Sequence, residues 1–434
     1  MSPLPDHPQR YALANELHAR PFPSIEAPCH AVFLAIKPDS NAAARDRQRD
    51  RDHLLALLDR FGMAHPAPGA THHSAEIGRN RLKWESHTEF VTYTAFCPDE
   101  PGRPFDPALA EAFPADWLEQ APGSCVTSVL IRAELLPENE DEVTRRLKEW
   151  FVPESLACSR VLDGAAIIAS DFRIDNAGHM RMAVFVQPGT GPRRVGRIVQ
   201  RLCEIETYKT MSMLGLARAR ALSPRMGELD ARLSGLVSDM TGGADRPEDT
   251  LRALLTISSE LENLLVQSSF RFGATSAYEA IVHQRIDVLR EERFQGRQTF
   301  AEFMMRRYDP AMRTVKSSEG RLRDLAERAM RAGTLLGTRV DVDRSAQNQK
   351  LLESMNRRAD MQLRLQHTVE GLSVVAISYY GVNLVANVLA PMSEPLGLGR
   401  GLLLALVTPP VVVAVWLLVR RIRKLLIRER DSEG

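Results

Sequence analysis

Two long runs of apolar residues stand out near the C-terminal end of the sequence. Residues 369–389 hold one acid, Glu370, at their edge, and residues 402–419 hold no charge at all. Each run is close to the ~20 residues that a helix needs to cross about 30 Å of hydrocarbon. The pattern predicts a transmembrane hairpin, with helices at 369–389 and 402–419 and a short external loop at 390–401 that is rich in Pro and Gly.

Basic residues on both sides of this hairpin indicate its orientation. Arg357, Arg358 and Arg364 precede the first span, whereas the connecting loop holds only Arg400. The tail 420–434 carries the basic residues Arg420, Arg421, Arg423, Lys424 and Arg428. Because positive charge stays on the cytoplasmic side, both termini are expected in the cytoplasm of a bacterium, with the inner membrane as the site. The tail is also expected to lie against anionic lipid.

A different pattern fills residues 1–188, where β-branched and aromatic runs alternate with short amphipathic helices. Strands are predicted at 29–37, 72–77, 79–96 and 125–136, and a hairpin at 163–187; helices are predicted at 42–62 and 138–151. The order strand, helix, strands occurs twice. We therefore expect a cytoplasmic α+β domain with a duplicated unit, built as one sheet with helices on a face.

The pattern of residues 189–368 is almost wholly helical and predicts a stalk. Met226, Leu229, Leu233, Leu236 and Met240 follow the a/d spacing of a coiled coil. A helix should break before Pro310, and a new one should run from there into the first span. The predicted fold is an α+β domain, a long helical stalk and a C-terminal transmembrane hairpin.

Composition narrows the class of protein. The net charge of +1 gives no support for nucleic-acid binding. Five cysteines with no C-x-x-C pair argue against a disulfide framework or a zinc site. The polar, proline-containing N-terminus does not read as a signal peptide, so the first domain is expected in the cytoplasm.

One cluster of polar residues is a candidate for chemistry. In the predicted strand 79–96, Glu85, His87 and Glu89 alternate onto one face, where they could hold a hard or borderline cation together with His72 and His73. Solvated charges on an open sheet face are the alternative. Nucleotide-binding and hydrolase motifs are lacking. We therefore predict no enzymatic activity and no cofactor.

The chain resembles an uncharacterised family of bacterial membrane-anchored proteins, known only as a domain of unknown function. The resemblance rests on HPQRYALANELHARPF near the N-terminus, on RLKWESHTEFVTYTAF, and on QNQKLLESMNRRADMQLRLQHTVEGLSVVAISYY at the first span. It therefore covers nearly the full length. It implies a cytoplasmic domain tethered by C-terminal helices, without an activity or site residues.

A weaker, architectural likeness is to the CorA-like channels for divalent metal ions, which carry a Gly-x-Asn where the first span ends. Here Gly381, Val382 and Asn383 match that tripeptide. Only 12 residues lie between Val369 and Tyr380, which places Asn383 near mid-bilayer rather than at a pore mouth. Hydrogen bonding between packed helices, shared with Asn387, is the other interpretation of Asn383.

These observations favour a non-enzymatic membrane protein that senses, binds or scaffolds, anchored in the lipid bilayer as a homo-oligomer. The alternative is a CorA-like channel or transporter that conducts Mg²⁺ or Zn²⁺. A third hypothesis is an enzyme that uses the face with Glu85, His87 and Glu89.

Overall fold

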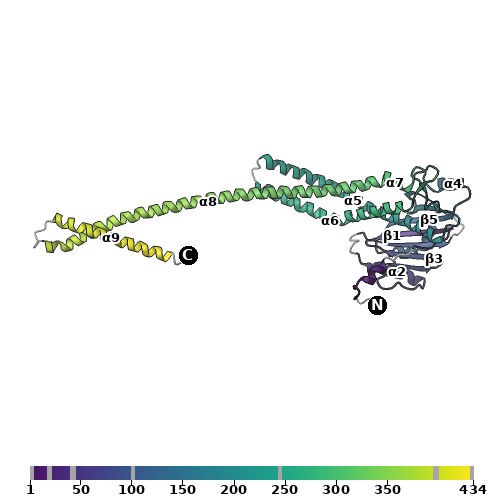
Figure 1. Ribbon diagram of the computed structural model, residues 1–434, viewed down its shortest axis with the longest axis horizontal. Coiled ribbons are helices and arrows are strands. Elements are labelled where there is room, and N and C mark those ends of the chain that lie inside the picture. Colours follow the sequence, from purple (N-terminus) through teal and green to yellow (C-terminus); the bar gives the residue numbers. More distant parts are fainter. Residues whose placement is uncertain are drawn as a thin grey trace. The chain divides into compact units, whose positions relative to one another are not determined.

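The computed structural model describes residues 4–16, 22–39, 45–98, 103–242, 247–393 and 400–430. The chain divides into two compact units, Met1–Gly333 and Thr334–Gly434. The first unit holds the sheet and its helices, and also most of the predicted stalk, up to Gly333. The second holds the rest of the stalk and the two apolar helices (Figure 1).

A mixed sheet forms the centre of the first unit. Its nine strands, counted within the described residues, lie in the order β2-β3-β4-β1-β5-β8-β7-β6-β9. Their bounds are β1 Cys29–Lys37, β2 His72–Ile77, β3 Asn80–Ser86, β4 Val91–Pro98, β5 Ser124–Leu135, β6 Ala157–Val161, β7 Ala166–Ile174, β8 Met180–Val186 and β9 Glu292–Arg293. The predicted α+β class is confirmed. Strand β6 escaped prediction, and the predicted strand 79–96 is divided into β3 and β4.

The two halves of the sheet share an order of elements. Each runs strand, helix and three strands, from β1 through α2 (Arg47–Arg60) to β4 and from β5 through α4 (Glu140–Trp150) to β8. In each half the first strand lies beside the fourth. However, β1 and β4 are antiparallel whereas β5 and β8 are parallel. The repeat therefore holds for the order of elements and not for the strand directions.

The main hydrophobic core lies between one face of the sheet and the helices α2 and α4. Leu54, Leu57 and Leu58 of α2 have no exposed surface, and neither do Val143 and Leu147 of α4. Burying one such side chain contributes about 1.5–3 kcal/mol. Side chains of the short helices η2 (Pro107–Ala112) and α3 (Ala115–Leu118) also pack in this core, and α1 (Arg10–Glu16) precedes β1.

A buried histidine in α2 is held neutral by its surroundings. The imidazole of His53 stacks on Trp117, with ring centroids 4.0 Å apart, and its Nε2 lies 3.0 Å from the Trp117 carbonyl oxygen. Nε2 must therefore carry the proton, and Nδ1 accepts the Tyr93 hydroxyl at 3.0 Å. Burial lowers the pKa of His53 because the charged form would lose its hydration.

Helices cover the second face of the sheet as well. The two helices predicted for the sheet domain, α2 and α4, do share one face, but the prediction did not include α5 (Pro192–Gly242), which packs its first turns on the other face. The first eight of the nine residues of β1 are buried. Because successive side chains of a strand point to opposite faces, both faces of the sheet must be covered at β1. The start of α5 is thus part of the sheet domain.

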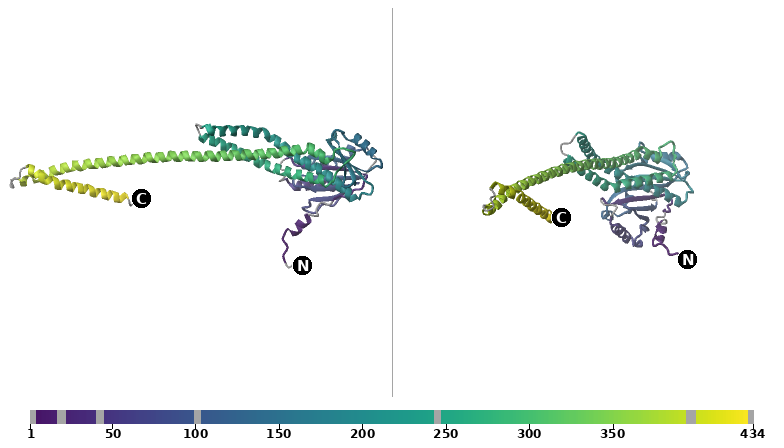
Figure 2. Two further views of the ribbon diagram at one scale, coloured as in Figure 1. Left: turned by 45° about the horizontal axis from the view of Figure 1, so that its top comes forward. Right: turned by 60° about the vertical axis from the view of Figure 1, so that its left-hand side comes forward.

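Three helices continue from this face as a bundle. Helix α6 (Pro247–Asp287) runs antiparallel to α5, as the contacts Arg218 to Ser268 and Ser212 to Thr275 show (Figure 2). The first turns of α8 (Asp309–Ser393) join them, where Arg321 and Arg328 both reach Asp230 at 3.1 Å. The apolar spacing predicted for this region reflects packing within one chain, since Met226, Leu229 and Leu233 are buried.

The start of α8 agrees with the prediction from Pro310. Helix α7 (Phe300–Arg307) begins with a capping box formed by Thr299 and Glu302, and it ends two residues before Asp309. From Asp309 a single helix continues to Ser393. It therefore includes the predicted first span.

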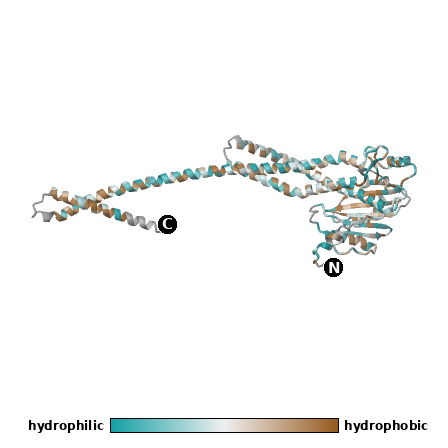
Figure 3. Ribbon diagram, viewed as in Figure 1, coloured by the Kyte–Doolittle hydropathy of each residue, from teal (hydrophilic) through white to brown (hydrophobic). Residues whose placement is uncertain are grey.

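The second unit consists of the remainder of α8 and of α9 (Arg400–Arg430). Apolar residues are concentrated in these helices around the predicted spans (Figure 3). Both helices are long and apolar enough to cross a membrane, judged by length and composition. Part of the predicted loop, residues 394–399, lies outside the described residues.

Candidate functional site

The predicted face of Glu85, His87 and Glu89 does not exist as a strand face. Strand β3 ends at Ser86, the His87 N–H donates to the Phe90 carbonyl at 2.9 Å, and β4 starts at Val91. The alternation of polar residues runs through a hairpin turn, where it no longer sorts side chains onto one face. This expectation was therefore wrong.

Arg45 holds this turn in place. Its guanidinium pairs with Asp50 at 2.6 Å, and both side chains are 3% exposed. The same group donates to the carbonyl oxygens of His87, at 2.7 Å, and Phe90, at 3.2 Å. Arg45 thus links the turn to Asp50 of α2, and removing it would leave the buried Asp50 carboxylate and the His87 carbonyl without this donor.

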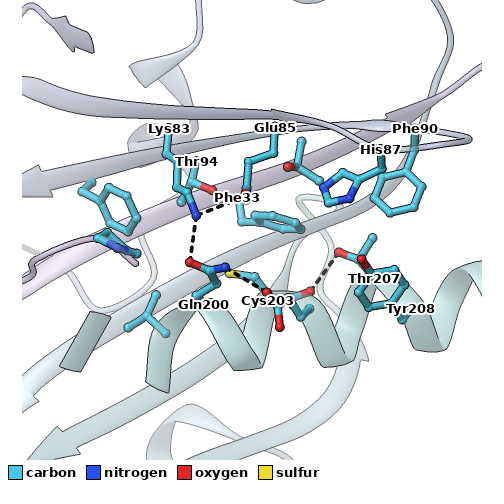
Figure 4. Close-up of a pocket in the computed structure, with 15 residues that line it drawn as sticks. Phe33, Lys83, Glu85, His87, Phe90, Thr94, Gln200, Cys203, Thr207 and Tyr208 are labelled. Carbon is cyan, nitrogen blue, oxygen red and sulfur yellow. Dashed lines mark hydrogen bonds and ion pairs between the residues drawn. The ribbon is translucent and has the colours of Figure 1, made fainter. Parts of the chain in front are cut away.

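The turn borders a pocket between the sheet and α5 (Figure 4). Its walls come from β1, β3 and β4 on one side and from α5 on the other. The lining residues are Pro23, Phe33, Lys83, Glu85, His87, Phe90, Thr92, Thr94, Phe96, Val199, Gln200, Cys203, Glu204, Thr207 and Tyr208. The volume not filled by protein atoms is about 420 Å³, which includes the part open to solvent. The centre of a water molecule can occupy about 30 Å³ of this volume. That space fits one or two waters.

A polar network crosses the pocket. The Lys83 ammonium donates to Gln200 Oε1 at 2.7 Å and lies 3.2 Å from a Glu85 oxygen. Gln200 in turn donates to Glu204 at 2.8 Å, and Arg285 of α6 pairs with the second oxygen of Glu204. The side chains of Lys83 and Glu85 are only 8% and 12% exposed. Charge is thus kept beside apolar walls because each charged group has a partner.

Aromatic rings form the rim of the pocket at the turn. His87 stacks on Phe90 with centroids 4.4 Å apart, and Tyr208 of α5 meets both rings edge-on at 6.3 and 6.0 Å. Such a rim presents flat apolar surfaces beside hydrogen-bonding groups. The arrangement suits the binding of a small molecule that has a polar end and an apolar body.

Glu89 does not line the pocket but forms a buried ion pair. Its carboxylate has no exposed surface and pairs with Arg271 of α6. The hydroxyl of Tyr278 donates to it at 2.8 Å. Burial, followed by the charge of Glu89, raises the pKa of Tyr278. Glu89 thus has a structural role, tying the turn to α6.

The histidines of β2 are divided between two faces. His72 lies opposite Glu85 in the register of β2 and β3, and His73 lies opposite Trp84. Over the described part of the chain, no three His, Cys, Asp or Glu side chains form a group that could hold a metal ion. Glu85 and His87 reach the same pocket, but Glu89 points elsewhere.

Cys203 is the thiol of the pocket, and burial raises its pKa. A buried protonated thiol is a poor nucleophile. The pocket therefore offers hydrogen bonds and apolar contact rather than an activated sulfur.

Sequence reasoning missed the half of the pocket that α5 supplies. Gln200 and Glu204 are four residues apart, on an otherwise apolar face that includes Val199 and Cys203. Polar residues at helical spacing within an apolar face are the signal that could have found them.

In the second unit, Gly381 belongs to the contact between α8 and α9. A Cβ at Gly381 would lie 3.1 Å from a methyl carbon of Val411. Ser378, Val382 and Ala386, one turn apart, are 6–8% exposed on this side of α8. The hairpin thus packs through small side chains, as membrane helices often do.

Asn383 and Asn387 do not join this contact, since both side chains are exposed. The Asn383 amide donates to the Tyr379 carbonyl of its own helix at 3.0 Å. Asn383 therefore does not pack α8 on α9, and a contact with a helix of another molecule stays a prediction. The helix also continues ten residues beyond Asn383, to Ser393, so the Gly-x-Asn lies inside the helix and not at its end.

The basic residues predicted for the tail, from Arg420 to Arg428, all lie in the last part of α9. Arg420 and Arg421 are exposed, and the Arg420 guanidinium lies 5.0 Å from the centre of the Trp416 ring. Arg423, Lys424 and Arg428 belong to the same helix, but their side chains lie outside the described ones.

Comparison with known proteins gives a family. No curated protein matches the sequence. Residues 5–426 match a family described as a protein of unknown function (DUF3422), which agrees with the near full-length resemblance found in the sequence. The chain therefore belongs to the DUF3422 family.

Proposed function

We propose that this protein is a non-enzymatic binding module, anchored in the cytoplasmic membrane by α8 and α9, with its sheet domain in the cytoplasm. The observation that carries the proposal is the exposure of large apolar side chains on both helices. Leu372, Leu384 and Leu406 are 74%, 69% and 70% exposed. Apolar surface left in water costs about 25 cal/mol per Å², and hydrocarbon chains of a bilayer would cover it.

The distribution of basic residues supports the orientation. Positive charge flanks the two spans at the ends that are away from the connecting loop, with Arg364 before the first span and Arg420 after the second. Cytoplasmic loops hold such residues in membrane proteins. We therefore propose that both termini lie in the cytoplasm.

Cysteine labelling tests the anchor and its orientation. In a Cys125→Ser background, which removes the exposed native thiol, single cysteines replace Ser393 at the end of α8 and Ser354 before the first span. A membrane-impermeant maleimide should label Ser393→Cys in intact spheroplasts. It should label Ser354→Cys only after the membrane is permeabilised.

Two results would overturn the anchor. Labelling of both positions only after permeabilisation would show that the hairpin does not cross the membrane. Labelling of Ser354→Cys in intact spheroplasts would reverse the orientation.

The pocket supports the binding role. It joins a paired Lys83 and Glu85 to aromatic walls, and it lies where α5 meets the sheet. We assign it to a small molecule with a hydrogen-bonding end and an apolar body, which would replace the water space and move the rim of His87 and Tyr208. Buried Cys203 and the lack of catalytic motifs favour binding over catalysis.

Small molecules that purify with the full-length protein test this role. Thr94→Phe fills the pocket, Glu85→Gln removes one charge from it, and Glu76→Gln changes an exposed residue of the neighbouring strand β2 as a control. Mass spectrometry of the extracted protein should find a compound with the wild type and Glu76→Gln. Its amount should fall about tenfold or more in the two pocket variants.

Thermal unfolding identifies any variant that fails to fold, and such a variant is left out. The binding role is wrong if folded Thr94→Phe protein carries the same compounds in the same amounts as the wild type.

A further inference from the structure

The middle of α8, in the second unit, is exposed along its whole length. All residues from 341 to 369 are exposed, among them Leu351, Met355 and Leu365, which are 61%, 57% and 66% exposed. A single helix in water gains little stability from its own hydrogen bonds, and it depends on packing of an apolar face. This stretch is therefore expected to be covered by a partner.

The apolar residues of this stretch follow a heptad pattern. Steps of four and three residues alternate along one stripe, here named the α8 seam. It comprises Leu351, Met355, Arg358, Gln362, Leu365, Val369, Leu372, Ala376, Tyr379 and Asn383. Seven of these ten side chains are apolar or aromatic, and all ten are exposed. This spacing is that of a helix that pairs along its length in a left-handed coiled coil.

Charge is kept off the seam and its borders. Residues 347–373 include seven charged residues: Lys350, Glu353, Arg357, Arg358, Asp360, Arg364 and Glu370. Six of them lie on the outer side of the helix, which here means the side that faces away from the seam. Only Arg358 is in the seam. The long side chain of Arg358 can place its charge at the edge of a packed pair. The positions that border the seam in this range, such as Ser354, Ala359 and Gln366, carry no charge, so two seams can meet without repulsion.

The seam does not compete with the contact between α8 and α9. That contact uses Ser378, Gly381 and Val382, whereas Tyr379 and Asn383 of the seam remain exposed. A partner helix and α9 can therefore occupy α8 at the same time.

We propose that the α8 seam binds the same seam of a second copy of this chain, in parallel and in register. The orientation rests on the proposed function, because two copies that cross one membrane in the same direction present parallel α8 helices. Asn383 falls at an a position of the heptad, where a polar residue fixes the register of paired helices. The pairing gives Asn383 a partner that α9 does not supply.

Disulfide crosslinking of the full-length protein in native membranes tests the seam. In the Cys125→Ser background, Leu365→Cys and Met355→Cys lie in the seam. Leu363→Cys and Glu353→Cys are matched controls two residues away on the outer side. Parallel seams bring equal positions near the roughly 4.4–6.8 Å between Cα atoms that a disulfide spans. The two seam variants should form dimers several-fold more than the controls after mild oxidation.

Sedimentation in detergent gives an independent measure. Leu365→Lys should weaken self-association, whereas Leu363→Lys should behave as the wild type. Equal crosslinking at Leu363 and Leu365, no crosslinking at either, or a monomeric wild type would each overturn the seam. If the labelling of Ser393→Cys still shows a spanning hairpin, such a result leaves the anchor intact and rejects the seam alone.

Discussion

At the scale of single residues, burial decides what each polar side chain of the turn between β3 and β4 does. Glu85 and Glu89 are four residues apart, and the alternating pattern predicts the same strand face for both. Glu85 faces the pocket with Lys83, whereas Glu89 is fully buried beside Arg271. Arg271 is 182 residues away along the chain, so local pattern holds no information about this partner.

Glu89→Gln is expected to destabilise the first unit strongly. The substitution removes the charge that compensates Arg271, and an unpaired buried charge costs about 3–5 kcal/mol. The matched control is Glu327→Gln, which breaks the exposed pair with Arg331, where both side chains are about 60% exposed. That pair is worth about 0–1 kcal/mol. Chemical unfolding in detergent, followed by tryptophan fluorescence, measures both.

Similar losses of unfolding free energy in the two variants would contradict this reasoning. They would mean that water reaches Glu89 and Arg271.

At the scale of elements, the periodic pattern located strands and helices but not their ends or neighbours. Residues 79–96 keep an alternating pattern through the turn at His87–Phe90, and so two strands read as one. The hairpin of β7 and β8 was predicted correctly, because Asp175 and Gly178 mark its turn. Strand β6 is five residues long, and it gives too short a pattern to recognise.

The close approach of α5 and α6 gives a prediction at this scale. At Gly215 a Cβ would lie 2.9 Å from the Cβ of Thr275, so Gly215→Ala must push the helices apart. Overpacking of this kind costs about 1–3 kcal/mol. Gly273→Ala on α6 meets no atom within 4 Å, and it should stabilise its helix by up to about 1 kcal/mol. Thermal unfolding of the two variants gives the comparison.

A Gly215→Ala protein as stable as the wild type would show that the helices can separate there without loss. A destabilised Gly273→Ala protein would show that α6 has a further contact at that position.

At the scale of the whole molecule, the two units differ in how far the sequence determines them. Residues 1–333 are joined by contacts between distant segments, such as Lys83 with Gln200, which are 117 residues apart. The described part of residues 334–434 consists of two helices whose large apolar side chains are mostly exposed. In the first unit, folding itself buries the apolar side chains. In the second unit, we expect lipid and a second copy of the chain to cover them.

The sequence by itself determined the two long apolar helical stretches, the start of α8 near Pro310, most of the strands and the α+β class. These features follow from periods of two to four residues and from runs of apolar residues, which are local properties. Only the tertiary structure decided the pairing of strand β5 with β8, the cover of α5 on the sheet, and the separation of Glu89 from the pocket. These depend on contacts between residues far apart in the chain, and no local pattern encodes which distant partner a buried charge will meet.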